Sequence, residues 1–186
     1  MFFEYGKRGQ LEVICGPMFA GKSSELLRRL QRARIAHLQY KLFKSILDDR
    51  YSETEVVTHE GSKMPSIPIQ DPNKIVAMSQ GARIVAIDEV QFLDVEIIDV
   101  IHALVKDQKR VIVSGLDQDA FGNTFGSMGD LLASADFVTK LKSICTVCGE
   151  PASKTQALVD QKEVVQVGGN SQYTARCLKH WNPPNR

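Results

Sequence analysis

The chain has 186 residues and a formal net charge of +1 at pH 7, with 43% hydrophobic and 24% charged residues. This length supports one full hydrophobic core, or one core with a small appendage, in an ordinary globular protein. The near-neutral charge gives no support for a polyanion-binding surface, and no apolar stretch approaches the ~20 residues that a membrane span needs. The N-terminus lacks a basic start followed by an apolar segment, so we expect a cytoplasmic protein.

The first motif along the chain is a complete phosphate-binding loop. An apolar run over 11–15 predicts a buried strand, and apolar residues at helical spacing predict a helix from 24 to about 38. Between them, residues 16–23 fit the pattern G-x-x-x-x-G-K-[ST] without a mismatch. In this pattern backbone N–H groups face phosphate oxygens, the lysine reaches the terminal phosphates, and the hydroxyl ligates Mg²⁺. The sequence therefore predicts a nucleoside triphosphate site formed by Gly16, Pro17, Met18, Phe19, Ala20, Gly21, Lys22 and Ser23.

The helix after the loop carries arginines at 28, 29, 32 and 34, mostly off its apolar face. A nucleic-acid surface is one interpretation, and a solvated helix face is the simpler one. A short strand is predicted over 40–44. Residues 45–72 are polar and punctuated by prolines, so we expect a hairpin or a mobile excursion there rather than part of the core. A helix ending near Gly81 is predicted after Asp71-Pro72.

A second buried strand ends in two adjacent carboxylates. Four consecutive apolar residues, 84–87, are typical of a strand buried on both faces, and Asp88 and Glu89 follow them. Open α/β sheets bind ligands at this end of their strands, and phosphate-loop proteins place an Mg²⁺-binding Asp there. Glu89 could activate water, as in an NTPase, or accept a proton from a substrate hydroxyl, as in a kinase. The alternative is that both carboxylates only cap the next turn.

The remaining elements complete an alternation of strands and helices. Helices are predicted over 94–106 and around 130–135, and strands over 109–115 and around 137–141. This alternation favours an α/β fold, a phosphate-loop (RecA-like) parallel sheet flanked by helices. We expect the ATP-binding domain to occupy 1–142 and a small zinc-stapled domain to occupy 143–186, because the composition changes at residue 143.

Cysteine spacing predicts a metal site in that C-terminal part. Cys145-x-x-Cys148 and Cys177-x-x-His180 are two tight ligand pairs, as a tetrahedral structural Zn²⁺ requires. A redox Cys-x-x-Cys or buried thiols are alternatives, but neither explains the second pair. The region is too small for a core of its own, which gives zinc a physical role as a staple. Cys15 is expected to be a small buried residue.

The stretch between the two pairs, 149–176, contains three basic and three acidic residues, so it has no net charge. A zinc ribbon that reads nucleic acid would be basic, whereas a neutral stretch suits the covering of a neutral acceptor. Gly168-Gly169 permits close backbone approach to such a ligand, and Tyr173 could equally be a ligand contact or ordinary packing.

Together these motifs resemble the thymidine kinases of the zinc-containing, cellular type (type II). The resemblance rests on residues 16–23, Ile-Asp-Glu-Val-Gln-Phe (87–92), Ser-Gly-Leu-Asp (114–117) and Val-Gly-Gly…Tyr-x-Ala-Arg-Cys (167–177), and it extends from about 10 to 181. It implies transfer of the ATP γ-phosphate to the 5′-hydroxyl of thymidine, which gives dTMP in nucleotide salvage. It also implies that deoxyuridine can be the acceptor. It further implies a homotetramer that the end product dTTP inhibits.

The resemblance also implies roles for individual residues. Glu89 corresponds to the general base, and Asp88 and Gln91 to the ATP and Mg²⁺ side. Near the acceptor and the transferred phosphate, the corresponding residues are Asp48 and Arg50. Around the thymine pocket they are Met18, Phe92, Leu116, Phe121 and Phe125. In the lasso that covers the nucleoside they are Thr155, Val164, Gly168 and Tyr173, with zinc held by Cys145, Cys148, Cys177 and His180.

One segment departs from the family pattern D-F-x-G-x-P-F. Residues 119–125 read Asp-Ala-Phe-Gly-Asn-Thr-Phe, so Ala120 occupies the usual aromatic position. Either Phe121 takes over that position by a local shift in register, or the pocket is looser. The alternative function is a nucleic-acid-dependent phosphate-loop ATPase with a zinc ribbon. A zinc-binding module without activity is a third class, and the intact Lys22, Ser23 and Glu89 argue against it.

Overall fold

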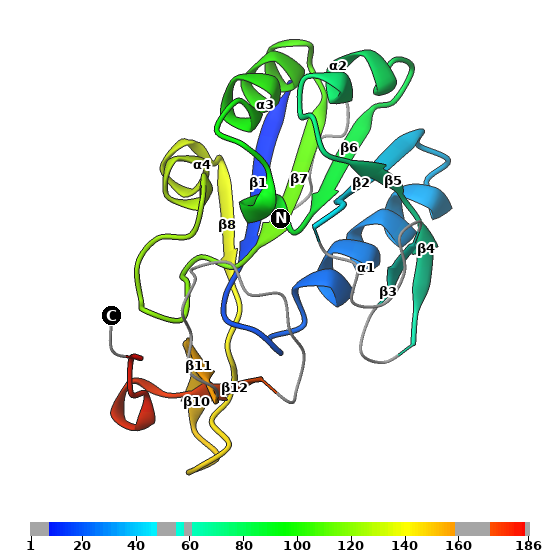
Figure 1. The fold of residues 1–186 in the computed structure, drawn as a ribbon. Helices are drawn as coiled ribbons and strands as arrows, with labels where there is room; N and C mark the ends of the chain where they lie inside the picture. Colours follow the sequence, from blue (N-terminus) through cyan, green and yellow to red (C-terminus); the bar gives the residue numbers. More distant parts are fainter. Residues whose placement is uncertain (1–7, 48–54, 58–60, 159–171, 185–186) are drawn as a thin grey trace.

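The computed structural model describes residues 8–47, 55–57, 61–158 and 172–184. Its centre is a six-stranded sheet with the order β5–β2–β6–β7–β1–β8 (Figure 1). The strands are β1 (Gln10–Cys15), β2 (Tyr40–Ser45), β5 (Ile67–Ile69), β6 (Ile84–Asp88), β7 (Arg110–Gly115) and β8 (Phe137–Lys140). Every pairing in this sheet is parallel, so all six carboxyl ends meet at one edge. This arrangement confirms the predicted parallel α/β sheet.

Both faces of the sheet are covered, because alternate strand residues point to opposite faces. Val13 and Val113 belong to the core that α2, α3 and α4 cover, whereas Ile14 and Ile112 belong to the core under α1. In Figure 1 the long helix α1 accordingly lies across the sheet from α3 and α4. The helices are α1 (Lys22–Ile35), α2 (Lys74–Met78), α3 (Ile97–Lys106) and α4 (Met128–Ser134), with 3-10 turns η1 (Val90–Phe92) and η2 (Leu178–His180).

Several predicted bounds shift by a few residues, and α1 shows the physical reason. The helix begins at Lys22 instead of 24, because Gly21 adopts a left-handed φ of +80° and the chain is helical directly after it. It ends at Ile35 instead of about 38, because His37 also has a left-handed φ of +55°. Neither turn changes the period of the apolar residues, so helical spacing alone could not place the ends.

The stretch 45–72 is more structured than we expected. The predicted hairpin is confirmed by β3 (Glu55–Val57) and β4 (Lys63–Pro65), which pair antiparallel. The exclusion of this stretch from the core is wrong, since Val56 and Met64 are buried under α1 and β5 extends the main sheet. Pro68 fits in β5 because an edge strand needs no N–H on its open side.

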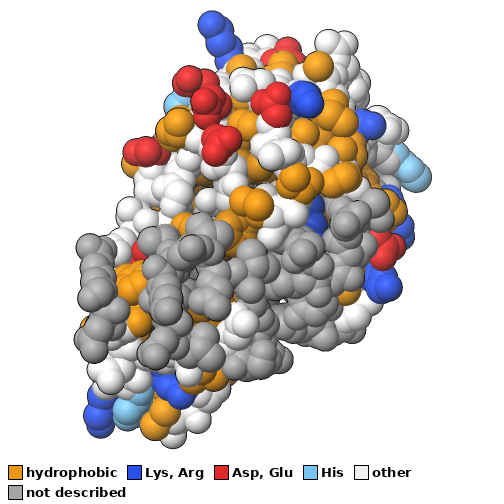
Figure 2. All heavy atoms as spheres, viewed as in Figure 1, with side chains coloured by type: hydrophobic (Ala, Val, Ile, Leu, Met, Phe, Trp, Pro, Cys, Tyr) orange, Lys and Arg blue, Asp and Glu red, His pale blue; other side chains and the backbone are white. Residues whose placement is uncertain are grey.

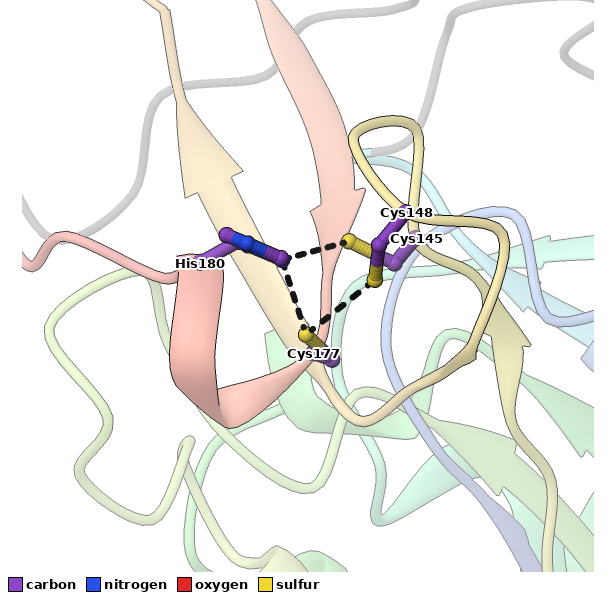
Figure 3. Close-up of side chains that lie close together, drawn as sticks. All are labelled: Cys145, Cys148, Cys177 and His180. Atoms are coloured by element: carbon purple, nitrogen blue, oxygen red, sulfur yellow. Dashed lines mark hydrogen bonds between the residues drawn. The ribbon is translucent and has the colours of Figure 1, made fainter.

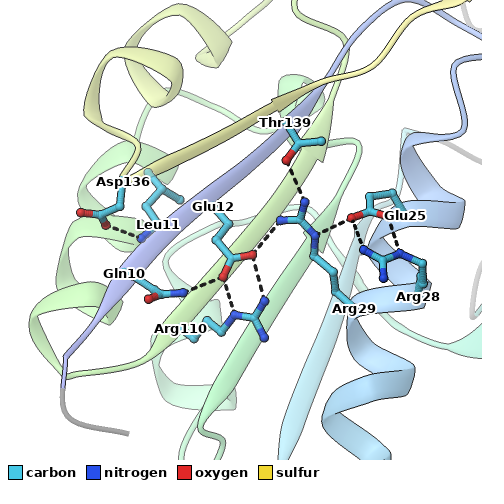
Figure 4. Close-up of polar contacts among 9 residues, drawn as sticks. All are labelled: Gln10, Leu11, Glu12, Glu25, Arg28, Arg29, Arg110, Asp136 and Thr139. Atoms are coloured by element: carbon cyan, nitrogen blue, oxygen red, sulfur yellow. Dashed lines mark hydrogen bonds and ion pairs between the residues drawn. The ribbon is translucent and has the colours of Figure 1, made fainter. Parts of the chain in front are cut away.

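A buried carboxylate, Glu12, joins α1 to the sheet (Figure 4). Glu12 is 2% exposed and accepts hydrogen bonds from Arg29 at 2.7 Å and from Arg110 at 2.9 Å. Burial raises the pKa of the Glu12 carboxyl, but hydrogen bonds and charge from the two arginines outweigh it and hold the pKa below its ordinary value. Arg28 and Arg29 also pair with Glu25, so half of the arginines considered for nucleic acid are neutralised by carboxylates.

The C-terminal part forms small antiparallel pairs below the sheet (Figure 1). They are β9 (Ser143–Ile144) with β10 (Pro151–Ala152) and β11 (Lys154–Ala157) with β12 (Tyr173–Arg176). The division into domains at 142/143 stays a prediction. A search of the described helices finds none with the length and apolar character to cross a bilayer.

Candidate active site

The phosphate loop connects β1 to α1, as the sequence predicts. Gly16 has a φ of +141°, and a Cβ added there would lie 2.4 Å from the carbonyl oxygen of Leu141, so a larger residue cannot occupy the position. Lys22 is 8% exposed, and its Nζ donates a hydrogen bond to the Pro17 carbonyl oxygen at 2.8 Å. The ammonium group therefore folds back over the loop instead of extending into solvent.

Asp88 ends β6 on the sheet face that α1 covers. Ala86, two residues earlier, packs under α1, so the period of the strand directs Asp88 to the same side. Asp88 Oδ2 accepts a hydrogen bond from Ser23 Oγ at 3.0 Å, and Oδ1 accepts one from Ser114 Oγ at the end of β7. Carboxylate and hydroxyl oxygens are hard ligands, so Ser23 and Asp88 fit the Mg²⁺ ion expected beside the phosphates.

Ser114 was missed in the sequence. Its signal is a polar residue that ends a buried strand, two places after Ile112, on the α1 face. That signal is visible only once β6 and β7 are known to be neighbours, which the sequence does not state.

Glu89 follows Asp88 in a left-handed conformation with φ +53° and ψ +44°. A non-glycine residue held there costs free energy, and such residues cluster at functional sites. The Glu89 side chain is 8% exposed, and its Oε2 accepts a hydrogen bond from Gln91 Nε2 at 2.6 Å. Gln91 Oε1 in turn accepts one from the Leu116 N–H at 3.1 Å. The amide of Gln91 thus lies between Glu89 and the strand end of β7, and its predicted contact with ATP or Mg²⁺ stays a prediction.

An apolar cluster adjoins the phosphate loop and contains most of the expected thymine pocket. Residues from separate segments meet in it, namely Met18, Leu116, Ala120, Phe125 and Tyr173, with Phe19, Phe92 and Ala157 packed against them. The rings of Phe92 and Phe125 meet edge to face, with 5.5 Å between centroids and 89° between planes. Because Met18 belongs to both the loop and the cluster, phosphates and an apolar ligand can be held on two sides of one short turn.

In segment 119–125, the structure places Ala120 in the apolar cluster that contains most of the expected thymine pocket. Ala120 is 5% exposed and packs in the apolar cluster, whereas Phe121 is half-buried and is not part of that cluster among the described residues. Gly122 has a φ of +86°, and a Cβ there would lie 2.7 Å from the Trp181 ring. The tight turn is therefore fixed from the C-terminal side, and a pocket role for Phe121 stays a prediction.

The C-terminal part contacts the phosphate loop directly. Thr155 is 6% exposed, and its Oγ1 accepts a hydrogen bond from the Met18 N–H at 3.1 Å. Ser143 Oγ donates a hydrogen bond to the Phe19 carbonyl oxygen at 3.1 Å. The loop backbone is thus held by residues more than a hundred positions away. Four further predicted site residues lie outside the described residues: Asp48, Arg50, Val164 and Gly168.

The buried carboxylate of Asp117 forms an ion pair with the exposed side chain of Lys140. Asp117, 4% exposed, accepts a hydrogen bond from Lys140 Nζ at 2.8 Å, and this bond raises the pKa of Lys140. Burial, together with the Asp117 charge, raises the pKa of the Cys15 thiol to about 11. Cys15 is therefore a neutral, buried thiol, as the sequence predicts.

Cys145, Cys148, Cys177 and His180 converge in the C-terminal part (Figure 3). Their potential ligand atoms all lie within 4.8 Å of one another, with Cys148 Sγ 3.8 Å from Cys177 Sγ and His180 Nδ1 3.3 Å from Cys177 Sγ. A tetrahedral Zn²⁺ with Zn–S bonds of about 2.3 Å separates two sulfurs by about 3.8 Å. Desolvation raises the pKa of the Cys145 thiol, but the backbone N–H groups of Cys177, Val147 and Cys148 outweigh it and lower the pKa to about 5. The four residues therefore fit the predicted zinc.

Comparison with known proteins identifies relatives for nearly the whole chain. The family model described as thymidine kinase matches residues 9–181. A thymidine kinase of a Rhodothermus species is 45% identical over 179 residues, which cover 96% of this chain and 84% of that protein. A thymidine kinase of Coprothermobacter proteolyticus is 47% identical over 184 residues, with 96% and 93% covered. Among solved structures, the genome packaging NTPase B204 of Sulfolobus turreted icosahedral virus 2 gives a TM-score of 0.48 at 13% identity over 76% of this chain and 77% of that one, a slight likeness that adds nothing to the family assignment.

Proposed function

The chain belongs to the thymidine kinase family, and from that premise we propose that it transfers the γ-phosphate of ATP to the 5′-hydroxyl of thymidine. Deoxyuridine is the second acceptor in this proposal. The observation that supports the proposed phosphate transfer is the position of Met18, which is part of the phosphate loop and of the apolar cluster. A nucleoside base in that cluster would bring its sugar towards the same loop that binds the phosphates.

The roles of the residues follow from the geometry of phosphoryl transfer, which demands positioning and charge neutralisation. Lys22 and the loop backbone hold the phosphates, and Ser23 with Asp88 would hold Mg²⁺, which would supply positive charge to neutralise the phosphates. Glu89 accepts the proton of the 5′-hydroxyl as that oxygen bonds to the γ-phosphorus. The bond from the γ-phosphorus to its bridging oxygen breaks at the same centre, and ADP leaves.

The covering of the acceptor is assigned to the C-terminal part. Thr155 and Tyr173 reach the loop and the apolar cluster from β11 and β12, and the zinc cysteines flank these strands. Zinc is structural in this proposal, because all four positions around it are filled by side chains and none is left for a reacting group. The homotetramer and the inhibition by dTTP rest on the family resemblance alone, and the cytoplasmic location remains a prediction.

Transfer of label from γ-labelled ATP to a panel of deoxynucleosides tests the proposal. We expect labelled monophosphates from thymidine and deoxyuridine and little ATP hydrolysis without an acceptor. ATP hydrolysis stimulated by DNA or RNA, without transfer to any nucleoside, would support the nucleic-acid-dependent ATPase instead. The described residues on the face drawn in Figure 2 carry no continuous basic stripe, which offers such an ATPase little to bind with.

A further inference from the structure

Gln91 is buried between the two halves of the active site, 3% exposed, in the turn η1 that follows Glu89. Its side-chain amide makes two hydrogen bonds, to Glu89 Oε2 at 2.6 Å and from the Leu116 N–H at 3.1 Å. Leu116 belongs to the apolar cluster of the acceptor, whereas Glu89 is the proposed base. The Gln91 amide therefore joins the wall of the acceptor pocket to the group that takes the proton.

The orientation of this amide is determined by its partners. A backbone N–H can only donate, so the carbonyl oxygen of Gln91 must face Leu116 and the NH₂ group must face Glu89. The bond to Glu89 is consequently a donation to a carboxylate, the stronger kind of hydrogen bond. This donated hydrogen bond fixes the orientation of the Glu89 carboxylate.

Two glycines leave the space in which Gln91 lies. A Cβ on Gly115 would be 2.5 Å from Gln91 Oε1, and a Cβ on Gly126 would be 2.3 Å from the Gln91 carbonyl oxygen. Real Cβ atoms do not approach so closely, so either methyl group would force Gln91 to move. Close packing against Gly115 and Gly126 therefore adds to the hydrogen bonds in positioning Gln91.

We propose that Gln91 is a positioning residue, which holds the Glu89 carboxylate in the orientation that accepts the proton from the 5′-hydroxyl of a nucleoside seated against Leu116. The inference rests on the proposed function, since it assigns a partner to the base of that reaction. It differs from a contact to ATP, because Gln91 then acts on the chemical step through Glu89 and not on donor binding. The proton passes from the 5′-hydroxyl to the Glu89 carboxylate, and Gln91 gains and loses none.

Three single variants separate the contributions of Gln91. Gln91→Met keeps the volume and loses both hydrogen bonds, whereas Gln91→Glu keeps an acceptor for Leu116 but offers no N–H to Glu89. Gly115→Ala leaves the amide intact and displaces it. Gly129→Ala in α4 is the matched control, because a Cβ there would meet only the Thr124 side chain, with Cγ2 at 3.4 Å and Cβ at 3.7 Å. Thermal unfolding of each variant shows which ones fold.

We expect Gln91→Met and Gln91→Glu to lower kcat by about 10²-fold, the effect of misplacing a reacting group by about 1 Å, with the KM for ATP within about twofold of the wild type. Gly115→Ala should lower kcat in the same pattern to a smaller extent, and Gly129→Ala should leave kcat and both KM values unchanged. An increase in the KM for ATP with an unchanged kcat in the Gln91 variants would overturn the inference and would favour a contact with the donor.

The decisive measurement is a double-mutant cycle with Glu89→Gln. If Gln91 acts through Glu89, adding Gln91→Met to Glu89→Gln lowers kcat by no more than about twofold beyond Glu89→Gln alone. A double variant that shows the product of the two single losses would overturn the positioning role. A wild type that phosphorylates no nucleoside would instead reject the proposed function, so the two failures are distinguishable.

Discussion

The donor side and the acceptor side of the candidate active site are built from different kinds of sequence. The donor side is one continuous loop, 16–23, with Asp88 brought beside it by the neighbouring strand β6. The acceptor side gathers Met18, Leu116, Phe125 and Tyr173 from three separate parts of the chain, since Leu116 and Phe125 share the connection between β7 and α4. The residues of the donor loop are adjacent in sequence, although Ser143 and Thr155 also hold the loop backbone, whereas the residues of the acceptor side meet only when the C-terminal part packs against the loop. The following changes should therefore affect the two sides unequally.

The largest expected effect is the loss of the base on the acceptor side. Glu89→Gln keeps the size of the side chain and removes its ability to take a proton, so we expect kcat for thymidine to fall by about 10²- to 10⁴-fold. ATP affinity, measured by equilibrium binding, should stay near that of the wild type, because the donor contacts are untouched. Near-normal turnover of the variant would show that Glu89 is not the base.

Removal of the metal should separate the two sides next. Chelation, or Cys177→Ser, releases β12 and with it Tyr173, so we expect the KM for thymidine to rise by about 10-fold or more. The KM for ATP should rise less, because Lys22, Ser23 and Asp88 lie outside the zinc-bearing part. Zinc content and the two KM values are measured on the same preparations. Equal changes in both KM values would show that donor and acceptor sides behave as one unit.

A change far from both sides should lower the free energy of unfolding and leave the kinetic constants unchanged. Because the pKa of Glu12 is held below its ordinary value, its ionised form stabilises the fold fully above the unfolded-state pKa, and this stabilisation is lost as the pH falls through the folded-state pKa. Glu12→Gln leaves Arg29 and Arg110 without their buried partner, at a cost of about 3 kcal/mol at pH 7.

Denaturant titrations from pH 7 to 3 check this expectation. The difference between wild type and Glu12→Gln should shrink as the pH is lowered, and the kinetic constants at pH 7 should match. A stability difference that does not change with pH would mean that packing, and not the charge of Glu12, connects α1 to the sheet.

The smallest expected effect comes from the contact that joins the two sides. Thr155→Val removes the acceptor of the Met18 N–H, and an unsatisfied buried donor costs about 1–3 kcal/mol of the free energy of unfolding. Thr155→Ser keeps the hydroxyl and is the matched control. We expect both KM values to rise by a few fold in Thr155→Val only, since Met18 serves both sides. A change in the KM for thymidine alone would place Thr155 at the nucleoside and not at the loop.

The sequence predicts best those parts of the site that are contiguous motifs. Residues 16–23 and the zinc pairs are contiguous motifs, and the structure places both as predicted. Asp88 is predictable because the apolar run before it indicates a buried strand and the position of that strand's carboxyl end. Ser114 was not found, because its meaning depends on which strands are neighbours. The family resemblance predicts a contact of Gln91 with ATP or Mg²⁺. The structure shows the Gln91 amide between Glu89 and Leu116, which the sequence does not indicate.

The edge strand β5 shows the corresponding limit for the fold. Three residues flanked by prolines and polar positions carry too little periodicity to indicate a strand, and their pairing with β2 is a tertiary property. The surroundings of segment 119–125, which departs from the family pattern, are likewise a tertiary property. Ala120 packs in the apolar cluster, and Trp181, near the far end of the chain, packs on the turn at Gly122; the sequence indicates neither contact.

The bond between Met18 and Thr155 also has a consequence for the order in which the protein folds. It closes a span of 137 residues, and contacts of such long range are made late because the entropy of closing the span must first be overcome. A nascent chain that has emerged only through β8 carries the whole phosphate-loop motif but lacks Ser143 and Thr155, which complete the loop backbone. We therefore expect nucleotide to stabilise the protein mainly after these contacts have formed, so ATP present during refolding should leave the phases that precede them unchanged.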